Sequence, residues 1–146
     1  MRFLFRLVVV AAGLATFSAL AAEEHAALVK SVTGEVSVVR QQQHLAPVAG
    51  TTLNMSDHIV TGAHASAAIV FKDGTLLTVG PDADVLIRNY VFEPKDNAFA
   101  FSLYLAKGSA IYESGKIGKL SPASVKVETP KATVGVRGTR FLIEAN

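Results

Sequence analysis

The sequence contains no cysteine, and this absence excludes both a disulfide framework and the lipid-modified cysteine of a lipoprotein. Tryptophan is absent as well, so the aromatic residues with a polar tip are three tyrosines, Tyr90, Tyr104 and Tyr112. Such side chains supply the amphipathic rings on which polar ligands stack. Binding of glycans or surface polymers therefore has little support and is kept as a third functional class.

Residue patterns typical of catalysis or of ligand binding are also missing. The sequence has four histidines, His25, His44, His58 and His64. None of them lies in a dense cluster of carboxylates, so we expect no metal site. Asp82 and Asp84 lack the further oxygen ligands of a calcium loop, residues 115–119 lack the spacing of a phosphate-binding loop, and no nucleophile elbow occurs. We therefore expect a protein that is not an enzyme and that holds no cofactor.

The N-terminus has the features of a secretory signal peptide. Met1–Ala22 begins with two arginines, continues with apolar residues from 7 to 20 and ends in small residues. A membrane anchor is the alternative, but the apolar run is shorter than the roughly 18–20 residues that span a bilayer. We expect cleavage near Ala21 or Ala22 and no stable membrane insertion afterwards. The product would be one domain, residues 23–146, in the periplasm or outside the cell.

Charge gives no support to a nucleic-acid partner. The chain carries 14 basic and 12 acidic residues, and two of the basic residues, Arg2 and Arg6, belong to the predicted signal peptide. The remaining chain is therefore close to neutral. Proteins that bind nucleic acids neutralise phosphates with Lys and Arg, so we expect no nucleic-acid partner.

Beyond the signal peptide, short stretches of alternating apolar and polar residues predict strands. We expect these strands at residues 36–38, 67–71, 77–79, 85–92, 99–105 and 110–113. Asp73-Gly74 is a strong signal for a tight hairpin turn between the second and third of them. Short strands with turns at close intervals predict a single all-β domain, packed as a sandwich or as a β-roll or solenoid-like structure.

The stretches between these strands are expected to be irregular, because they are rich in Gly, Pro and polar residues. We expect a frayed start or a short helix at Glu23–Ala27. Turns are expected at Gln41–His44, Glu93–Asn97 and Lys107-Gly108, and loops at Thr51–Asp57 and Gly115–Ser124.

The stretch that organises the chain is Val125–Ile143. Its apolar side chains are Val125 and Val127 on odd positions, Val134 and Val136 on even ones, and Phe141 and Ile143 on odd ones again. Because side chains on a strand switch faces at every residue, one flat strand cannot place all six in one core. We therefore expect three short strands, joined by corners near residues 129–132 and 137–140.

Each corner contains residues suited to it. Pro130 cannot donate to a strand ladder and favours an extended conformation at Thr129. Gly138 permits a bulge or a positive φ, and Gly135 lets another backbone come close. Arg137 either anchors a partner or, as we favour, fixes the corner by bonding carbonyl oxygens.

Residues 129–141, T-P-K-A-T-V-G-V-R-G-T-R-F, resemble the signature of the FecR domain, T-P-x-A-x-x-x-V-R-G-T-x-F. A second run, Asp57–Ile87, is similar to another block of that family, although Ser56 stands where the family usually has Gly. With Gly34–Val36, the resemblance covers residues 34–143. The residues that it singles out for a structural or partner-binding role are Thr129, Pro130, Gly135, Arg137, Gly138, Thr139, Phe141, Asp73 and Gly74.

FecR domains are best known from periplasmic parts of regulators that relay iron-siderophore signals to an anti-sigma system. The resemblance therefore implies an exported β-domain with a protein partner in the cell envelope. Those regulators place a cytosolic segment and a membrane helix before the domain, whereas only a signal peptide is expected here. We therefore favour a stand-alone binding or scaffolding module. The alternative is a sensing module in envelope signalling that acts through another membrane protein.

Phe141–Ile143 is an apolar strand, and no later strand is expected to cover it. Unless the N-terminal strand pairs with it, its backbone groups lie on an open edge. Such an edge suits a partner that binds by adding a strand. The alternative, which we favour, is a closed core in which Phe141 and Ile143 are simply buried.

Overall fold

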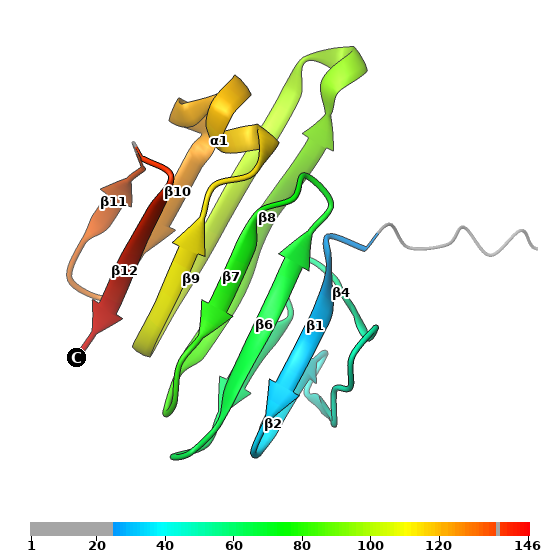
Figure 1. The fold of residues 1–146 in the computed structure, drawn as a ribbon, viewed down its shortest axis with the longest axis vertical. Helices are drawn as coiled ribbons and strands as arrows, with labels where there is room; N and C mark the ends of the chain where they lie inside the picture. The colour runs from blue at the N-terminus through cyan, green and yellow to red at the C-terminus, as the bar shows by residue number, and fades with distance from the viewer. Residues whose placement is uncertain (1–24, 137) are drawn as a thin grey trace, which may run out of the picture.

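The computed structural model describes residues 25–136 and 138–146. Most of this part of the chain is in β-strands, which confirms the prediction of a single all-β domain. Two sheets curl toward each other into a half-barrel (Figure 1), and one long strand, β9 (Ala98–Glu113), belongs to both. Among the described residues, all strand pairs are antiparallel except β9 with β10.

Apart from β9, each strand belongs to one of these two sheets. The first has the order β4-β1-β6-β7-β9-β12, with β1 (Ala27–Thr33), β4 (Thr52–Leu53), β6 (Ser66–Phe71), β7 (Leu76–Val79) and β12 (Arg140–Ala145). The second has the order β3-β2-β5-β8-β9-β10-β11, with β2 (Val36–Arg40), β3 (Gln43–Leu45), β5 (His58–Thr61), β8 (Asp84–Glu93), β10 (Val125–Glu128) and β11 (Thr133–Gly135). The helical turns are η1 (Pro94–Asp96), α1 (Lys116–Leu120) and η2 (Pro122–Ser124).

β9 continues without interruption through Lys107-Gly108, so the turn predicted there is wrong. Gly108 has a φ of +86°, and a Cβ on it would lie 2.5 Å from the Cα of Ala83. Beside it, the register of β8 against β9 shifts between Asp84 and Val85. The glycine therefore forms a bend rather than a reversal. This bend carries β9 from the second sheet into the first.

The core lies between the sheets and is filled by every second residue of the alternating strands. The ring of Phe101 lies 4.8 Å from that of Phe71 and 5.5 Å from that of Tyr112, edge-on in both cases. All three rings are almost completely buried. Aromatic pairs of this geometry contribute about 0.5–1.5 kcal/mol beyond the burial of their area, so β9 holds the two sheets together.

Several elements depart from the sequence-based expectation, among them β5, for which no strand was expected, and β3, which begins inside the predicted turn Gln41–His44. Ala27, expected in a frayed start or short helix, begins β1, and residues 23–24 lie outside the described chain. β4 lies in the predicted loop Thr51–Asp57 and buries Leu53 completely. α1 lies in the predicted loop Gly115–Ser124 and buries Ile117 completely.

A tight turn before β5 contains the residue that departs from the FecR pattern. Ser56 has a φ of +72° there, the left-handed conformation that glycine adopts without steric cost. The neighbouring Asp57 is buried and accepts hydrogen bonds from Arg40 Nε (2.9 Å), Arg40 Nη2 (2.6 Å) and the Asn54 N–H (2.8 Å). The bidentate pair fixes this turn to the end of β2.

Candidate functional site

The open side of the half-barrel is formed by the residues of the organising stretch. β10 runs parallel to the first half of β9, and β11 pairs with β10. β12 pairs with the second half of β9 and so lies in the other sheet. β11 and β12 lie next to each other at the same side of the molecule (Figure 1), and among the described strands they do not pair with each other. We call this region, residues 125–145, the seam.

The three predicted strands of the seam are present, but one apolar side chain is placed differently from the prediction. Val125, Val127, Val136 and Ile143 are buried. Val134 is 38 % exposed, so the expectation that all six apolar residues enter the core is wrong. Val134 lies opposite Val127 in the β10–β11 ladder and therefore shares its inward face. It stays exposed because the sheets are open at this side.

The first corner is the turn between β10 and β11. Thr129 closes it with a hydrogen bond from its N–H to the carbonyl of Ala132 (2.8 Å), and the Ala132 N–H approaches the Thr129 hydroxyl at 3.2 Å. Pro130 lies inside this turn, where its missing N–H leaves no ladder bond unmade.

The second corner leads from β11 into β12. Gly138 has a φ of +148°, and a Cβ on it would meet nothing within 4 Å. The requirement for glycine is therefore one of backbone conformation and not of space. The carbonyl of Thr139 accepts a hydrogen bond from the Ser114 N–H (2.7 Å), which starts the β9–β12 ladder. Arg137, predicted to fix this corner, lies outside the described residues.

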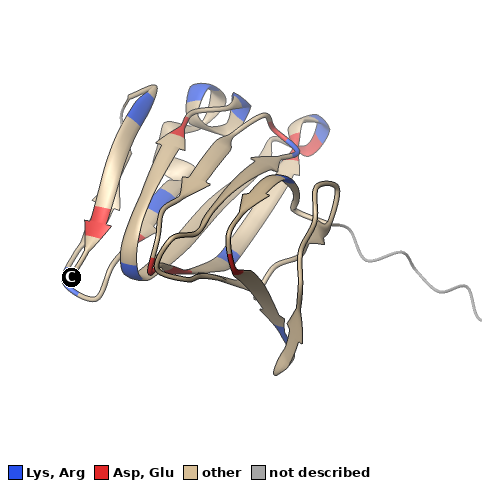
Figure 2. Ribbon diagram, turned by 60° about the horizontal axis from the view of Figure 1, so that its bottom comes forward, with Lys and Arg blue, Asp and Glu red and all other residues tan. Residues whose placement is uncertain are grey.

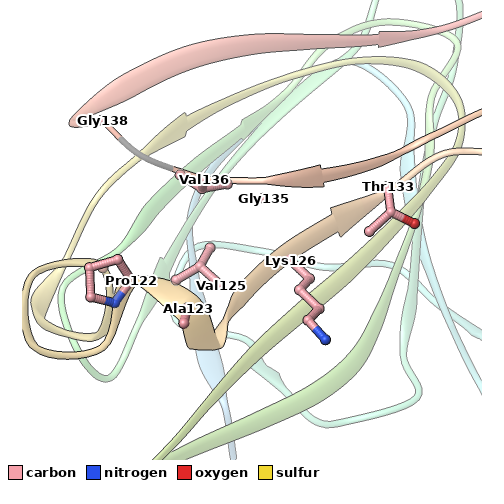
Figure 3. Close-up of a pocket in the computed structure, with 9 residues that line it drawn as sticks. Pro122, Ala123, Val125, Lys126, Thr133, Gly135, Val136 and Gly138 are labelled. Carbon is pink, nitrogen blue, oxygen red and sulfur yellow. The ribbon is translucent and has the colours of Figure 1, made fainter.

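A cavity of about 860 Å³ lies where the seam meets α1 and η2 (Figure 3). Its lining consists of Gly118, Pro122, Ala123, Val125, Lys126, Thr133, Gly135, Val136 and Gly138. Val125 and Val136 are the buried part of this wall. Lys126 is exposed and is the one charged residue among the described residues of the lining. We call this space the seam cavity.

Gly135 belongs to the strand side of the seam cavity. It lies opposite Lys126 in the ladder, so a side chain there would share the face of Lys126. Nothing lies within 4 Å of a Cβ at this position. The predicted close approach of another backbone is therefore not found among the described residues. The glycine instead leaves open space on the face that it shares with Lys126.

Asp73 connects the predicted hairpin turn to the helical wall of the cavity. Gly74, with a φ of +86°, makes the turn between β6 and β7. The buried Asp73 carboxylate accepts hydrogen bonds from the Thr75 hydroxyl (2.7 Å), the Tyr90 hydroxyl (3.0 Å) and the Ile117 N–H (3.0 Å). Asp73 therefore holds α1 against the sheet, and α1 carries Gly118 into the cavity wall.

The protonated hydroxyl of Tyr90 donates one of the hydrogen bonds that hold the Asp73 carboxylate in place. Burial and the nearby negative charge of Asp73 raise the pKa of the Tyr90 phenol. The phenol therefore stays protonated at neutral pH and donates to the carboxylate. Tyr90 and Tyr112 are both buried, so two of the three tyrosines considered for glycan stacking belong to the core.

Two further pairs of polar side chains lie on the second sheet. His58 Nδ1 lies 3.0 Å from Asp84 Oδ1, and Arg88 pairs with Glu128 over the ring of Tyr104. Within residues 25–136 and 138–146, no three His, Asp or Glu side chains are grouped as metal ligands would be. Basic and acidic residues are interspersed around the sheets (Figure 2).

Comparison with known families agrees with this geometry. Residues 57–146, well over half of the chain, match the family model described as FecR protein. The chain belongs to the FecR family. The matched FecR region contains β5 to β12, and therefore both the seam cavity and the Asp73 cluster. No curated protein and no solved structure matches the chain.

The FecR signature and the Asp-Gly turn occupy distinct places in the fold. Thr129, Pro130, Gly135, Gly138, Thr139 and Phe141 lie together along the seam. Asp73 and Gly74 lie in the β6–β7 turn and reach the seam through α1. The polar, glycine and small residues of the cavity that the sequence did not indicate are Gly118, Pro122, Ala123, Lys126 and Thr133. The first three lie in a stretch predicted to be a loop, and no pattern in the sequence signals their role.

The described part of the FecR chain has no helix with the length and apolarity needed to cross a membrane. The predicted signal peptide, Met1–Ala22, lies outside the described residues.

Proposed function

We propose that this protein is an exported, non-enzymatic FecR module that binds a protein partner in the cell envelope through the seam cavity. The observation that carries the proposal is that the family signature itself lines the cavity, with Gly135, Val136 and Gly138 in its wall. Hollows with an apolar wall and few polar groups are the usual places for binding. Val125 and Val136 suit an apolar side chain of the partner, and Lys126 suits a neighbouring carboxylate.

Membership of the FecR family favours signal transduction across the envelope as the process that this binding serves. Scaffolding, which the sequence alone favoured, becomes the second candidate. In a sensing role, occupation of the seam cavity changes the activity of a membrane-bound regulator. In a scaffolding role, it holds an assembly together without a change in transcription.

A block of the seam cavity tests the proposal. Gly135→Trp adds a large side chain beside Lys126 at the cavity, and the open space around Gly135 lets the fold accept it. A photoreactive residue at Thr133, which also lines the cavity, should form a covalent adduct with one envelope protein in living cells. Gly135→Trp should abolish that adduct.

Val48→Trp is the matched control, because Val48 is 67 % exposed in a loop and lies outside the cavity lining. It should leave the adduct unchanged. An adduct that persists in Gly135→Trp, or its absence in the unblocked protein, contradicts the proposal. Transcription separates the two roles: sensing predicts that Gly135→Trp changes the output of one alternative sigma factor, and scaffolding predicts no such change.

A further inference from the structure

β12 has a free backbone edge within the described chain. It pairs with β9 from Arg140 to Ala145, and none of the other described strands pairs with its opposite side. The Ser114 N–H bonds to the Thr139 carbonyl (2.7 Å), so Thr139 and every second residue after it direct their backbone groups toward β9. The N–H and C=O groups of Arg140, Leu142 and Glu144 therefore point away from the sheet.

The side chains of the same three residues share the outer face of the sheet. Arg140 and Glu144 are exposed, and Leu142 is 59 % exposed, whereas Ile143 on the opposite face is buried. The outer face thus presents a cation, an apolar group and an anion at intervals of two residues. In an antiparallel copy of the strand the order is reversed, so the cation of one copy lies opposite the anion of the other. The strand is therefore complementary to itself.

We propose that a second copy of this chain binds this edge, with the two β12 strands antiparallel about a two-fold axis at Leu142. In this register, Leu142 faces Leu142 of the second copy, and each Arg140 faces a Glu144. All three pairs are of the hydrogen-bonded kind, because their backbone groups point to the open edge. The interface is isologous, as in most homodimers.

The neighbouring contacts favour this register over others. Arg140 Nε lies 3.4 Å from Glu113 Oε1 across the β9–β12 ladder, so Arg140 would lie between two carboxylates. A register shifted by two residues places Leu142 opposite a charged residue. A shift by one residue turns the Phe141 face toward solvent. Only the register centred on Leu142 pairs every charge.

The inner face of the paired strands also gains contacts. A groove of about 440 Å³ beside β12 is lined by residues that include Val134, Val136, Phe141 and Ile143. In the two-fold register, Phe141 of one copy lies opposite Ile143 of the other. Such directly opposed apolar pairs stabilise antiparallel strands. The pairing therefore extends the core across the axis and covers the exposed Leu142.

This inference does not rest on the proposed function. The dimer uses the backbone edge of β12 and the groove beside it, and this groove shares Gly135 and Val136 with the seam cavity that the proposed partner would occupy. Self-association of the purified protein and an adduct with a different protein in cells are separate results.

Sedimentation of the purified protein over a range of concentrations is the first test. We expect a shift from monomer to dimer between about 1 µM and about 1 mM. A protein that stays monomeric throughout overturns the proposal.

Leu142→Cys should form a covalent dimer on oxidation, because opposed Cα atoms lie about 5.5 Å apart in such pairs. Leu28→Cys is the control, because Leu28 is also exposed but its strand β1 is paired on both sides, so it should form no covalent dimer. Equal rates of disulfide formation in the two variants would also overturn the proposal.

Charge reversal identifies the register. In the Arg140→Glu variant, two carboxylates face each other at each end of the interface. In the Glu144→Arg variant, two guanidinium groups face each other there. Each variant should therefore be monomeric. A mixture of the two should form a heterodimer, because every pair then has opposite charges. Circular dichroism verifies that both variants are folded. A mixture that stays monomeric, or a single variant that still dimerises, overturns the proposal.

Discussion

Ser56 adopts a backbone conformation that glycine adopts more easily, with a φ of +72°. Its N–H bonds to the Ile87 carbonyl (2.7 Å), which holds the turn in this conformation. Ser56→Gly should therefore raise the free energy of unfolding by about 0.5–1 kcal/mol, because strain is relieved at some cost in chain entropy. Urea denaturation measures it. Ser102→Gly, in the interior of β9 between β8 and β10, is the control and should destabilise the protein by a similar amount; a stabilising effect at both sites would contradict the account.

Asp73 is the residue whose loss should affect both the β6–β7 turn and α1. Both carboxylate oxygens of Asp73 accept hydrogen bonds. In Asp73→Asn, an NH2 group replaces one of these oxygens, so at least one buried N–H or O–H is left without an acceptor. We expect a loss of about 2–3 kcal/mol in the free energy of unfolding. Asp82→Asn, in an exposed turn with a φ of +50° that Asn tolerates, should change it by less than about 0.5 kcal/mol. Equal effects in denaturant melts would show that the Asp73 cluster contributes little.

At the scale of elements, the longer alternating strands were predicted, whereas β1, β5 and α1 were not. The strand at residues 99–105 alternates without a break and is present in β9. β1 was missed because its pairing with β6 shifts register between Val29 and Ser31, which interrupts the alternation. α1 was missed because it is held by an Asp73 carboxylate 44 residues away in the sequence. The helical side of the seam cavity depends on that contact, so only the strand side could be predicted.

The second corner of the seam gives a prediction about backbone conformation. Gly138→Val places a β-branched residue at a φ of +148°, which should cost roughly 1–3 kcal/mol of stability. Gly135→Val is a matched control, because the same side chain enters open space on a strand, where valine is favoured. Denaturant melts should show a loss for the first variant and none for the second. Similar values for both would refute a conformational role for Gly138.

At the scale of the whole molecule, the two sheets depend on a core that contains two buried phenols. Burial raises the pKa of Tyr90 and of Tyr112 above the value of about 10 found in unfolded chains. The stability that both phenols contribute is therefore complete below pH about 10 and is lost as the pH rises toward the folded-state pKa. Tyr112→Phe should reduce the slope of stability against pH above about 10, as measured by denaturant midpoints. A slope that the substitution leaves unchanged would contradict this.

The central claim is that the FecR signature leaves the half-barrel open at the seam, with β12 bonded on one side. Amide hydrogen exchange followed residue by residue tests it most directly, in the Glu144→Arg variant so that self-pairing is suppressed. The account predicts alternation along β12: slow exchange at Phe141, Ile143 and Ala145, whose N–H groups face β9, and fast exchange at Arg140, Leu142 and position 144. Uniformly slow exchange from Arg140 to Ala145 would show that the edge is already paired, and would contradict the open seam.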